Sequence, residues 1–439
     1  MSNSGIKIGC AFLNQLGRID SGGLASVEGG EAFHFTGLDT LRARGDLWVV
    51  TSPESQFLVD NGLSHAYLRH SGFLPTPLTA IAEELGARSA IPTAEVVQRV
   101  SEVLARVLSM VDLMAPAAPS VLETGAQTLA SHLQMAVAPA LREDDIPAEL
   151  REGLPSMFKG APPIGTSAVG DIAVRIPANR LRLSQIVMSS AVPGGHWEEM
   201  DMSRYPSAAM ALSYAIGNQL PVLCQVVLKA SGSRSGGARQ PSDAQDLSAG
   251  AVANAKSKLS APLIRHMSAG AARWMALPEI IALSRIVDVA PKRIFIASEL
   301  VPADASLVIP APVFSPAAAA SISAGLFAEL YMQSVSQPAG LAHVGSSLPT
   351  PQTFSIRGAW LGSVARSYML QEAMALADAN FNVTSVGAAH LIVSISRRAL
   401  RNLRKHVAAS SLLSYPTGLK QLEELASPAR ETHMNQGAG

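Results

Sequence analysis

A histidine and three carboxylates form the densest group of residues that could do chemistry. His196, Glu198, Glu199 and Asp201 follow the pair Gly194-Gly195, and such side chains can bind a metal ion or share acid–base work. Their spacing is not that of the two-histidine helical zinc motif. The two glycines predict a turn, and carboxylates after a turn commonly face water or cap a helix. We therefore expect a structural loop here.

Other catalytic motifs are missing from the sequence. The stretch 165–170 departs by one residue from the nucleophile-elbow spacing, and the glycines at 22, 23, 29 and 30 form no dinucleotide fingerprint. We accordingly expect no catalytic residue, no metal, no cofactor and no enzymatic activity. The alternative that stays open is an enzyme with a dispersed site near His196 and Glu198.

A run of cations near the C-terminus points to different chemistry. Five of them fall at helical offsets 0, 1, 4, 7 and 8 and so share one broad face: Arg397, Arg398, Arg401, Arg404 and Lys405. Leu400, Leu403 and Val407 mark a second face that can pack inward. The five cations are candidate nucleic-acid-binding residues, because they can contact phosphates and release counterions. The alternative is a solvated face, or one paired with acidic residues of a neighbour.

This basic helix, expected over 397–410, closes a C-terminal helix–hairpin–helix unit. A helix over 358–379 precedes a hairpin of strands at 381–386 and 391–395. The order loosely resembles a polymerase palm, which carries acidic residues at the hairpin turn to hold magnesium. Here the turn is Gly387-Ala388-Ala389, so we reject two-metal chemistry.

Further elements follow from hydrophobic periodicity and from capping and breaking residues. Thr76 is placed to cap a helix that ends at Gly86, and Ser120 with Glu123 forms a capping box. The remaining helices are expected from Thr93 to about 114, over 244–285 and over 316–334. Strands are expected at 46–51, 171–176, 181–188, 223–228, 293–297 and 306–309.

The predicted fold class is α+β, predominantly helical with several short strands. We divide the chain into a strand- and turn-rich start followed by helices (1–150), a mixed α+β region (151–336), a C-terminal α+β unit (337–427) and a loose tail (428–439). The Gly/Ser-rich stretch 230–243 is expected to be a flexible loop, in which Arg234 and Arg239 could add contacts to nucleic acid.

Composition favours self-assembly. Of 439 residues, 48% are hydrophobic and only 15% charged, and 34 basic residues balance 34 acidic ones. A soluble domain usually carries roughly a quarter charged residues and a net charge away from zero. We therefore expect subunit contacts to cover much of the surface. Two cysteines cannot form a disulfide framework, and the absence of a long apolar run predicts no membrane contact.

By length and composition, the chain resembles the coat proteins of small double-stranded RNA viruses of fungi and protists, the partitivirus- and totivirus-like group. The resemblance implies a coat subunit that forms homodimers and a closed capsid around the RNA genome, with a viral polymerase as a further partner. It places the protein in the virion and the host cytoplasm. The other readings are the dispersed-site enzyme and a nucleic-acid-binding protein that uses the basic helix.

Overall fold

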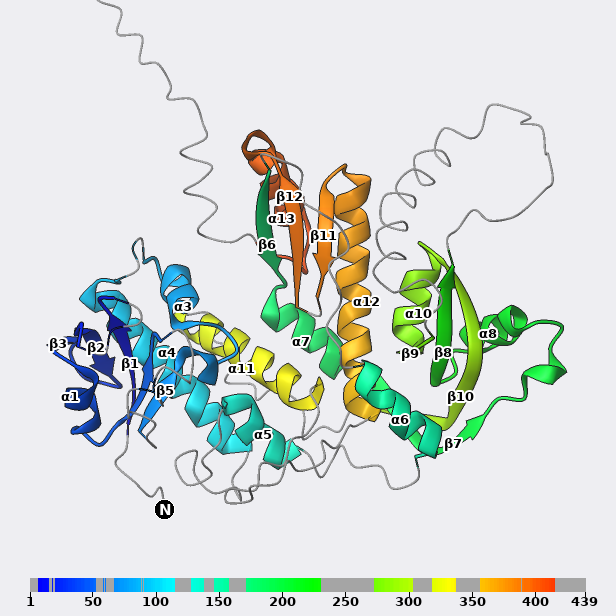
Figure 1. The fold of residues 1–439 in the computed structure, drawn as a ribbon, viewed down its shortest axis with the longest axis horizontal. Helices are drawn as coiled ribbons and strands as arrows, with labels where there is room; N and C mark the ends of the chain where they lie inside the picture. The colour runs from blue at the N-terminus through cyan, green and yellow to red at the C-terminus, as the bar shows by residue number, and fades with distance from the viewer. Residues whose placement is uncertain are drawn as a thin grey trace, which may run out of the picture.

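The computed structural model places three β-sheets around a helical centre (Figure 1). It describes residues 7–15, 18, 20–52, 58, 60, 67–87, 89, 91–114, 128–137, 146–157, 171–229, 272–302, 318–336, 356–387 and 389–414. The expected capping box at Ser120, the 230–243 loop with Arg234 and Arg239, the strand at 306–309 and the tail all lie outside these residues. Helices and strands are both abundant, which confirms the α+β class.

The first sheet has five strands in the order β3-β2-β1-β4-β5. Its central strand β1 (Ile8–Leu13) pairs antiparallel with β2 (Gly23–Val27) and parallel with β4 (Leu47–Val50). The edges are β3 (Phe33–Phe35) and β5 (Leu68–His70). Helix α4 (Ala94–Met114) packs on one face, and α1 (Leu38–Arg42) contributes Leu38 and Leu41 to the cluster on the other. Because both faces are covered, every residue of β1 is buried.

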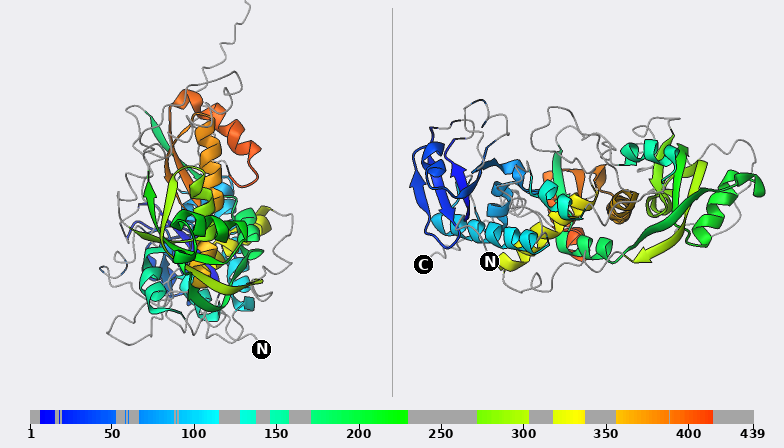
Figure 2. Two further views of the ribbon diagram at one scale, coloured as in Figure 1. Left: turned by 90° about the vertical axis from the view of Figure 1, so that its right-hand side faces the viewer. Right: turned by 90° about the horizontal axis from the view of Figure 1, so that it is seen from below.

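The second sheet has the order β7-β10-β8-β9 and lies at the opposite end of the molecule, as Figure 2 shows from below. Its strands are β7 (Ala191–Glu199), β8 (Val222–Lys229), β9 (Arg273–Ala276) and the long β10 (Asp288–Pro302). Helices α6 (Ala148–Met157), α8 (Ala208–Gly217) and α10 (Leu277–Ser284) pack on these strands. The interior position expected for 223–228 is confirmed, since β8 pairs on both sides.

The third sheet combines distant parts of the chain. The hairpin β11 (Asn382–Val386) and β12 (His390–Ile395) is completed by β6 (Ile172–Pro177), which pairs antiparallel with β12. Helix α12 (Ile356–Asp378) packs against β11 and β12. The short 3₁₀ helix η6 (Arg397–Ala399) and helix α13 (Leu400–Ala409) then follow β12. The expected helix–hairpin–helix unit is therefore confirmed, with one additional strand.

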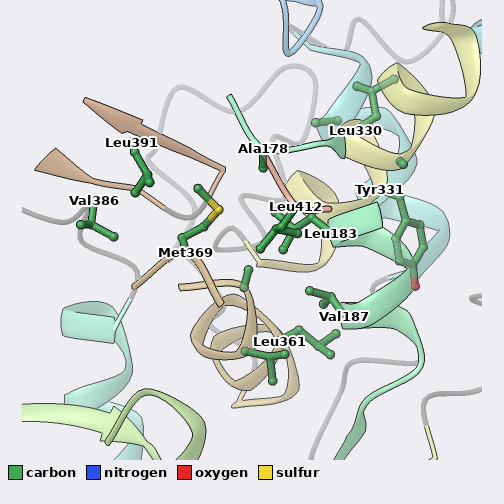
Figure 3. Packing of buried hydrophobic residues seen from close by; sticks show 14 of the residues in the cluster. Ala178, Leu183, Val187, Leu330, Tyr331, Leu361, Met369, Val386, Leu391 and Leu412 are labelled. Carbon is green, nitrogen blue, oxygen red and sulfur yellow. The ribbon is translucent and has the colours of Figure 1, made fainter. Parts of the chain in front are cut away.

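Helix α11 (Ala318–Ser336) connects these layers, since it contacts α4, α5 (Leu129–Val137), α7 (Arg180–Met188) and α12. Apolar side chains of the central helices and the third sheet meet in one cluster (Figure 3). The cluster includes Leu183, Val187, Leu330, Tyr331, Leu361, Met369, Val386 and Leu391. A single core thus continues from the central helices into the third sheet.

A charged network ties α7 to both α3 (Leu78–Glu84) and α11. The Arg180 guanidinium lies 3.0 Å from a Glu84 carboxylate oxygen and 2.8 Å from Glu329. Its Nη2 donates to the Thr76 hydroxyl, which donates in turn to Glu329. The expectation that Thr76 caps the helix is therefore wrong: Pro77 occupies the N-cap, and the Thr76 hydroxyl is used between helices.

Three further sequence expectations are wrong. Residues 181–188 lie in helix α7, because Asn179 accepts from the Arg182 amide and Leu183 and Val187 lie one turn apart on the buried side. Residues 273–276, expected within a helix, form the edge strand β9.

The third error is the loop expected around Gly194-Gly195, which is strand β7. The glycines mark an irregularity in the pairing with β10, not a turn, because the register shifts between Ala297 and Glu299. Gly195 has φ of 71°, and a Cβ there would collide with the Ser298 hydroxyl. The backbone conformation and the close approach both require glycine.

Replacing Arg180 by methionine should lower the free energy of unfolding by about 2–3 kcal/mol, because Glu84 and Glu329 lose their shared cation at a partly buried site. The matched control is Arg99→Met, which breaks an exposed ion pair with Glu95 within α4 and should cost less than about 0.5 kcal/mol. Urea denaturation measures both. Equal small losses would contradict a structural role for the network.

Stability should also fall as the pH drops from about 7 to 5, because burial lowers the pKa of His132 below 6.5. In that range the unfolded chain takes up a proton that the folded His132 does not. The folded state therefore loses stability as the pH falls toward the lowered pKa. His132→Gln should flatten this part of the curve of unfolding free energy against pH. Parallel curves for the two proteins would show that His132 makes no such contribution.

Candidate nucleic-acid interface

The five predicted cations lie together on the surface. Arg397 and Arg398 belong to η6, and the other three belong to α13. All five side chains are exposed, whereas Leu400, Leu403 and Val407 are buried in the core. The expected division of this helix into a basic face and an apolar face is confirmed. We call the exposed set, namely Arg397, Arg398, Arg401, Arg404 and Lys405, the basic stripe.

The ends of this helical segment are held in place by the third sheet. At its start, η6 follows β12 after a single residue, Ser396. At its end, the Ser410 hydroxyl accepts from the amides of Leu412 and Leu413. The Asn179 amide then donates to the Leu412 carbonyl at 2.6 Å. The basic stripe is therefore carried on a fixed element, with its orientation set by the third sheet.

Acidic partners are scarce around the basic stripe. Neither η6 nor α13 contains an aspartate or a glutamate. Within the described part of the chain, no carboxylate lies within ion-pair distance of Arg397, Arg398, Arg401 or Lys405. The positive charge is accordingly not neutralised by acidic side chains of the same helix.

A cavity of about 400 Å³ adjoins the stripe. Its walls come from the end of α12, the start of β6, the end of β12 and one side of α13. The polar and aromatic residues that matter are Asp171, Asn380, Phe381, Asn402, Lys405 and His406. Lys405 belongs both to the basic stripe and to the cavity wall, so the two features are continuous.

Sequence reasoning missed this cavity because its walls are distant in the chain. The Ser394 hydroxyl donates to the Asp171 carboxylate at 3.1 Å across 223 positions. Phe381 and His406 pack edge to face, with ring centroids 5.2 Å apart. The one local signal is Asn380, which follows a long helix at a position that favours glycine or asparagine.

The histidine and three carboxylates after Gly194-Gly195 do not converge on one point in the structure. His196 Nε2 and Glu198 Oε1 are 3.2 Å apart, but the two side chains are 65% and 78% exposed. Glu199 instead binds Arg293 through two bonds of 2.7 Å, which lower the pKa of Glu199. Asp201 accepts from the Ser203 hydroxyl and amide, which lower its pKa.

These separate roles leave no shared site. Among the residues that the structure describes, no group of three histidine, cysteine, aspartate or glutamate side chains could hold a metal ion. Cys224 is buried, as expected, and so is Cys10. Burial raises the pKa of the Cys224 thiol to about 12 and that of Cys10 higher still, which makes both poor nucleophiles. In the same described residues, no helix has the length and hydropathy to cross a membrane.

The apolar content also has a structural explanation. Most large hydrophobic side chains in the described residues lie in a core that reaches all three sheets, or in a smaller core on the far face of the first sheet. The exposed exceptions in those residues are few, and two of them are one turn apart on α8: Ile91, Leu113, Met210, Tyr214, Leu300 and Tyr368. A high apolar fraction therefore reports a large interior, so it does not by itself argue for a surface covered by other subunits.

Comparison with known proteins finds few similarities. No protein-family model matches the chain, and no curated protein matches it. Two solved structures of Phi29 DNA polymerase are similar. The complex with primer-template DNA and incoming nucleotides has a TM-score of 0.36 at 10% identity, covering 90% of this chain and 81% of the polymerase. The binary complex with primer-template DNA has a TM-score of 0.39 at 11% identity, covering 89% and 80%.

Neither solved structure is a coat protein. This comparison contradicts the interpretation of the chain as a capsid subunit and the expectation of a non-enzyme. TM-scores this low establish neither a shared fold nor a shared activity. No family is assigned to the chain, and its function has to be argued from the basic stripe and its surroundings.

Proposed function

We propose that this chain binds nucleic acid, with the basic stripe of η6 and α13 contacting the phosphate backbone. Five arginine and lysine side chains within nine residues offer a dense set of phosphate ligands. Arginine and lysine contact phosphates without reading bases, so this part of the interface is expected to be independent of sequence.

The proposal rests on one observation: like charges cluster on this helical segment although they lower its stability. Arg401 stands four residues from both Arg397 and Lys405, and like charges at that spacing destabilise a helix by about 0.2–0.5 kcal/mol per pair. Arg397 and Arg398 also lie at the N-terminal end, where the helix dipole disfavours cations. A solvated face would be more stable with mixed charges. A bound polyanion would relieve both costs.

Charge elsewhere in the chain limits the range of the interaction. With 34 basic and 34 acidic residues, the whole protein has no net positive field that would attract a polyanion over long distances. The attraction is therefore local, acting within about 8–10 Å in physiological salt. The affinity should then depend on the stripe itself and not on total charge.

A triple replacement tests this proposal. Arg397→Gln, Arg401→Gln and Arg404→Gln together should weaken binding of a fluorescent oligonucleotide and reduce the steepness of log K against log salt by about 2–3, since each phosphate contact contributes about 0.7–0.9. Fluorescence anisotropy over a salt series measures both quantities.

The matched control removes the same charge from other elements. Arg99→Gln, Arg106→Gln and Arg285→Gln alter three exposed arginines of α4 and the α10 C-terminus. This control variant should bind as the unmodified protein does. Equal losses in the two triple variants would indicate a general charge effect and would refute the assignment to the stripe.

A further inference from the structure

Resting on the proposed nucleic-acid binding, we propose that the cavity beside α13 receives one unpaired base, so that the ligand is single-stranded nucleic acid. The cavity volume of about 400 Å³ falls within the range of roughly 300–1,000 Å³ typical of small-molecule sites. A flat heterocycle entering it would stay attached to a phosphate backbone that lies along the basic stripe.

Aromatic side chains form one corner of the cavity. The Phe381 and His406 rings meet at an interplanar angle of 77°, so their planes stand nearly perpendicular. A base can stack on the face of one ring while its own edge meets the face of the other. Such stacking is tolerant of sequence because every base has a π-face. Phe381 is half-buried against the core, which holds its ring in position.

Asp171 distinguishes a base from a phosphate. Asp171 lines the cavity, where its carboxylate would repel an anionic phosphate and can accept from the exocyclic amino group of a base. Ser394 donates to the Oδ2 atom of Asp171, which orients the carboxylate. Lys405, at the junction of cavity and stripe, is placed for the phosphate next to the inserted base. One carboxylate and one ammonium group on the same cavity wall thus match the amino group and the phosphate of a single nucleotide.

Backbone geometry fixes the aromatic corner. Helix α12 ends in a Schellman motif, in which the Asn380 amide donates to Ala377 and the Phe381 amide donates to Leu376. Asn380 adopts φ of 66°, a left-handed conformation that asparagine tolerates better than most residues. This turn directs the chain from α12 into β11 and sets Phe381 at the cavity wall. The site is therefore preorganised, which reduces the entropic cost of binding.

A site that takes up one base favours single-stranded ligands. A base inside a duplex is stacked and paired, so placing it in a cavity requires extrusion at a cost of a few kcal/mol. An unpaired strand avoids that cost. The cavity should therefore favour single strands over duplexes and, through Asp171, adenine and cytosine over thymine, which has no exocyclic amino group.

The experiment compares labelled oligo-dA, oligo-dC and oligo-dT with a duplex of equal length by fluorescence anisotropy. His406→Ala removes an exposed ring and should weaken binding of oligo-dA and oligo-dC about tenfold. Duplex binding and its salt dependence should not change. Phe381→Leu, which keeps an apolar side chain at the core, should act in the same direction. Asp171→Asn should reduce the preference for oligo-dA and oligo-dC over oligo-dT.

The outcomes separate the cavity from the stripe. If single strands and duplex bind equally and His406→Ala has no effect, the cavity assignment is wrong, although the stripe variants can still support nucleic-acid binding. If free deoxyadenosine monophosphate binds as tightly as oligo-dA, the ligand is a free nucleotide and the assignment to a strand is wrong. If neither oligonucleotides nor duplex bind, both proposals fail. Thermal unfolding of each variant checks that it is folded.

Discussion

The placement of the third sheet relative to the first depends on the charge of Arg180. Its guanidinium is only 19% exposed and lies between Glu84 of α3 and Glu329 of α11. A cation taken out of water needs such partners, because the desolvation cost is several kcal/mol. Helix α7 begins at Arg180 and β6 ends three residues earlier. The contacts that neutralise this arginine therefore also fix where the third sheet, and with it α13, stands relative to the first.

Apolar side chains also join α7 to the elements around it. Leu183 and Val187 of α7 face a cluster that reaches α11, α12 and β12. Ion pairs of this kind set geometry more than stability, whereas the buried hydrocarbon supplies most of the favourable free energy. A large interior needs many apolar residues, so the fraction of charged residues in the chain is low. The same composition would fit a subunit covered by its neighbours, which is why composition alone led to an incorrect interpretation as a capsid protein.

Sequence patterns predicted elements whose periodicity reflects one buried face. Helices α4 and α13 and strand β6 follow from such patterns. Helices α11 and α12 and strands β4, β8, β11 and β12 were predicted from their apolar composition and from the breaking residues that flank them. The failures at α7 and β7 have physical causes. The run Arg180–Met188 contains both alternating and helical spacing, and an asparagine cap decides for the helix. Gly195 reads as a turn, but in the sheet it permits a close approach to Ser298. The helical spacing of the cations was enough to predict the basic stripe from the sequence. The cavity could not be predicted, because it forms only when β6 pairs with β12.

That pairing also places opposite charges side by side in a chain with no net charge. Antiparallel pairing of β6 with β12 brings Asp171 beside Ser394, in the cavity wall that α13 also lines. The Asp171 carboxylate and the Lys405 ammonium group share this wall, and the other four cations of the basic stripe are outside it. A uniformly basic pocket would draw phosphate inward and exclude the base. Opposite charges on adjacent elements would orient the proposed ligand, with the base toward Asp171 and the phosphate toward Lys405. Because these charges cancel, they add nothing to the net charge of the protein.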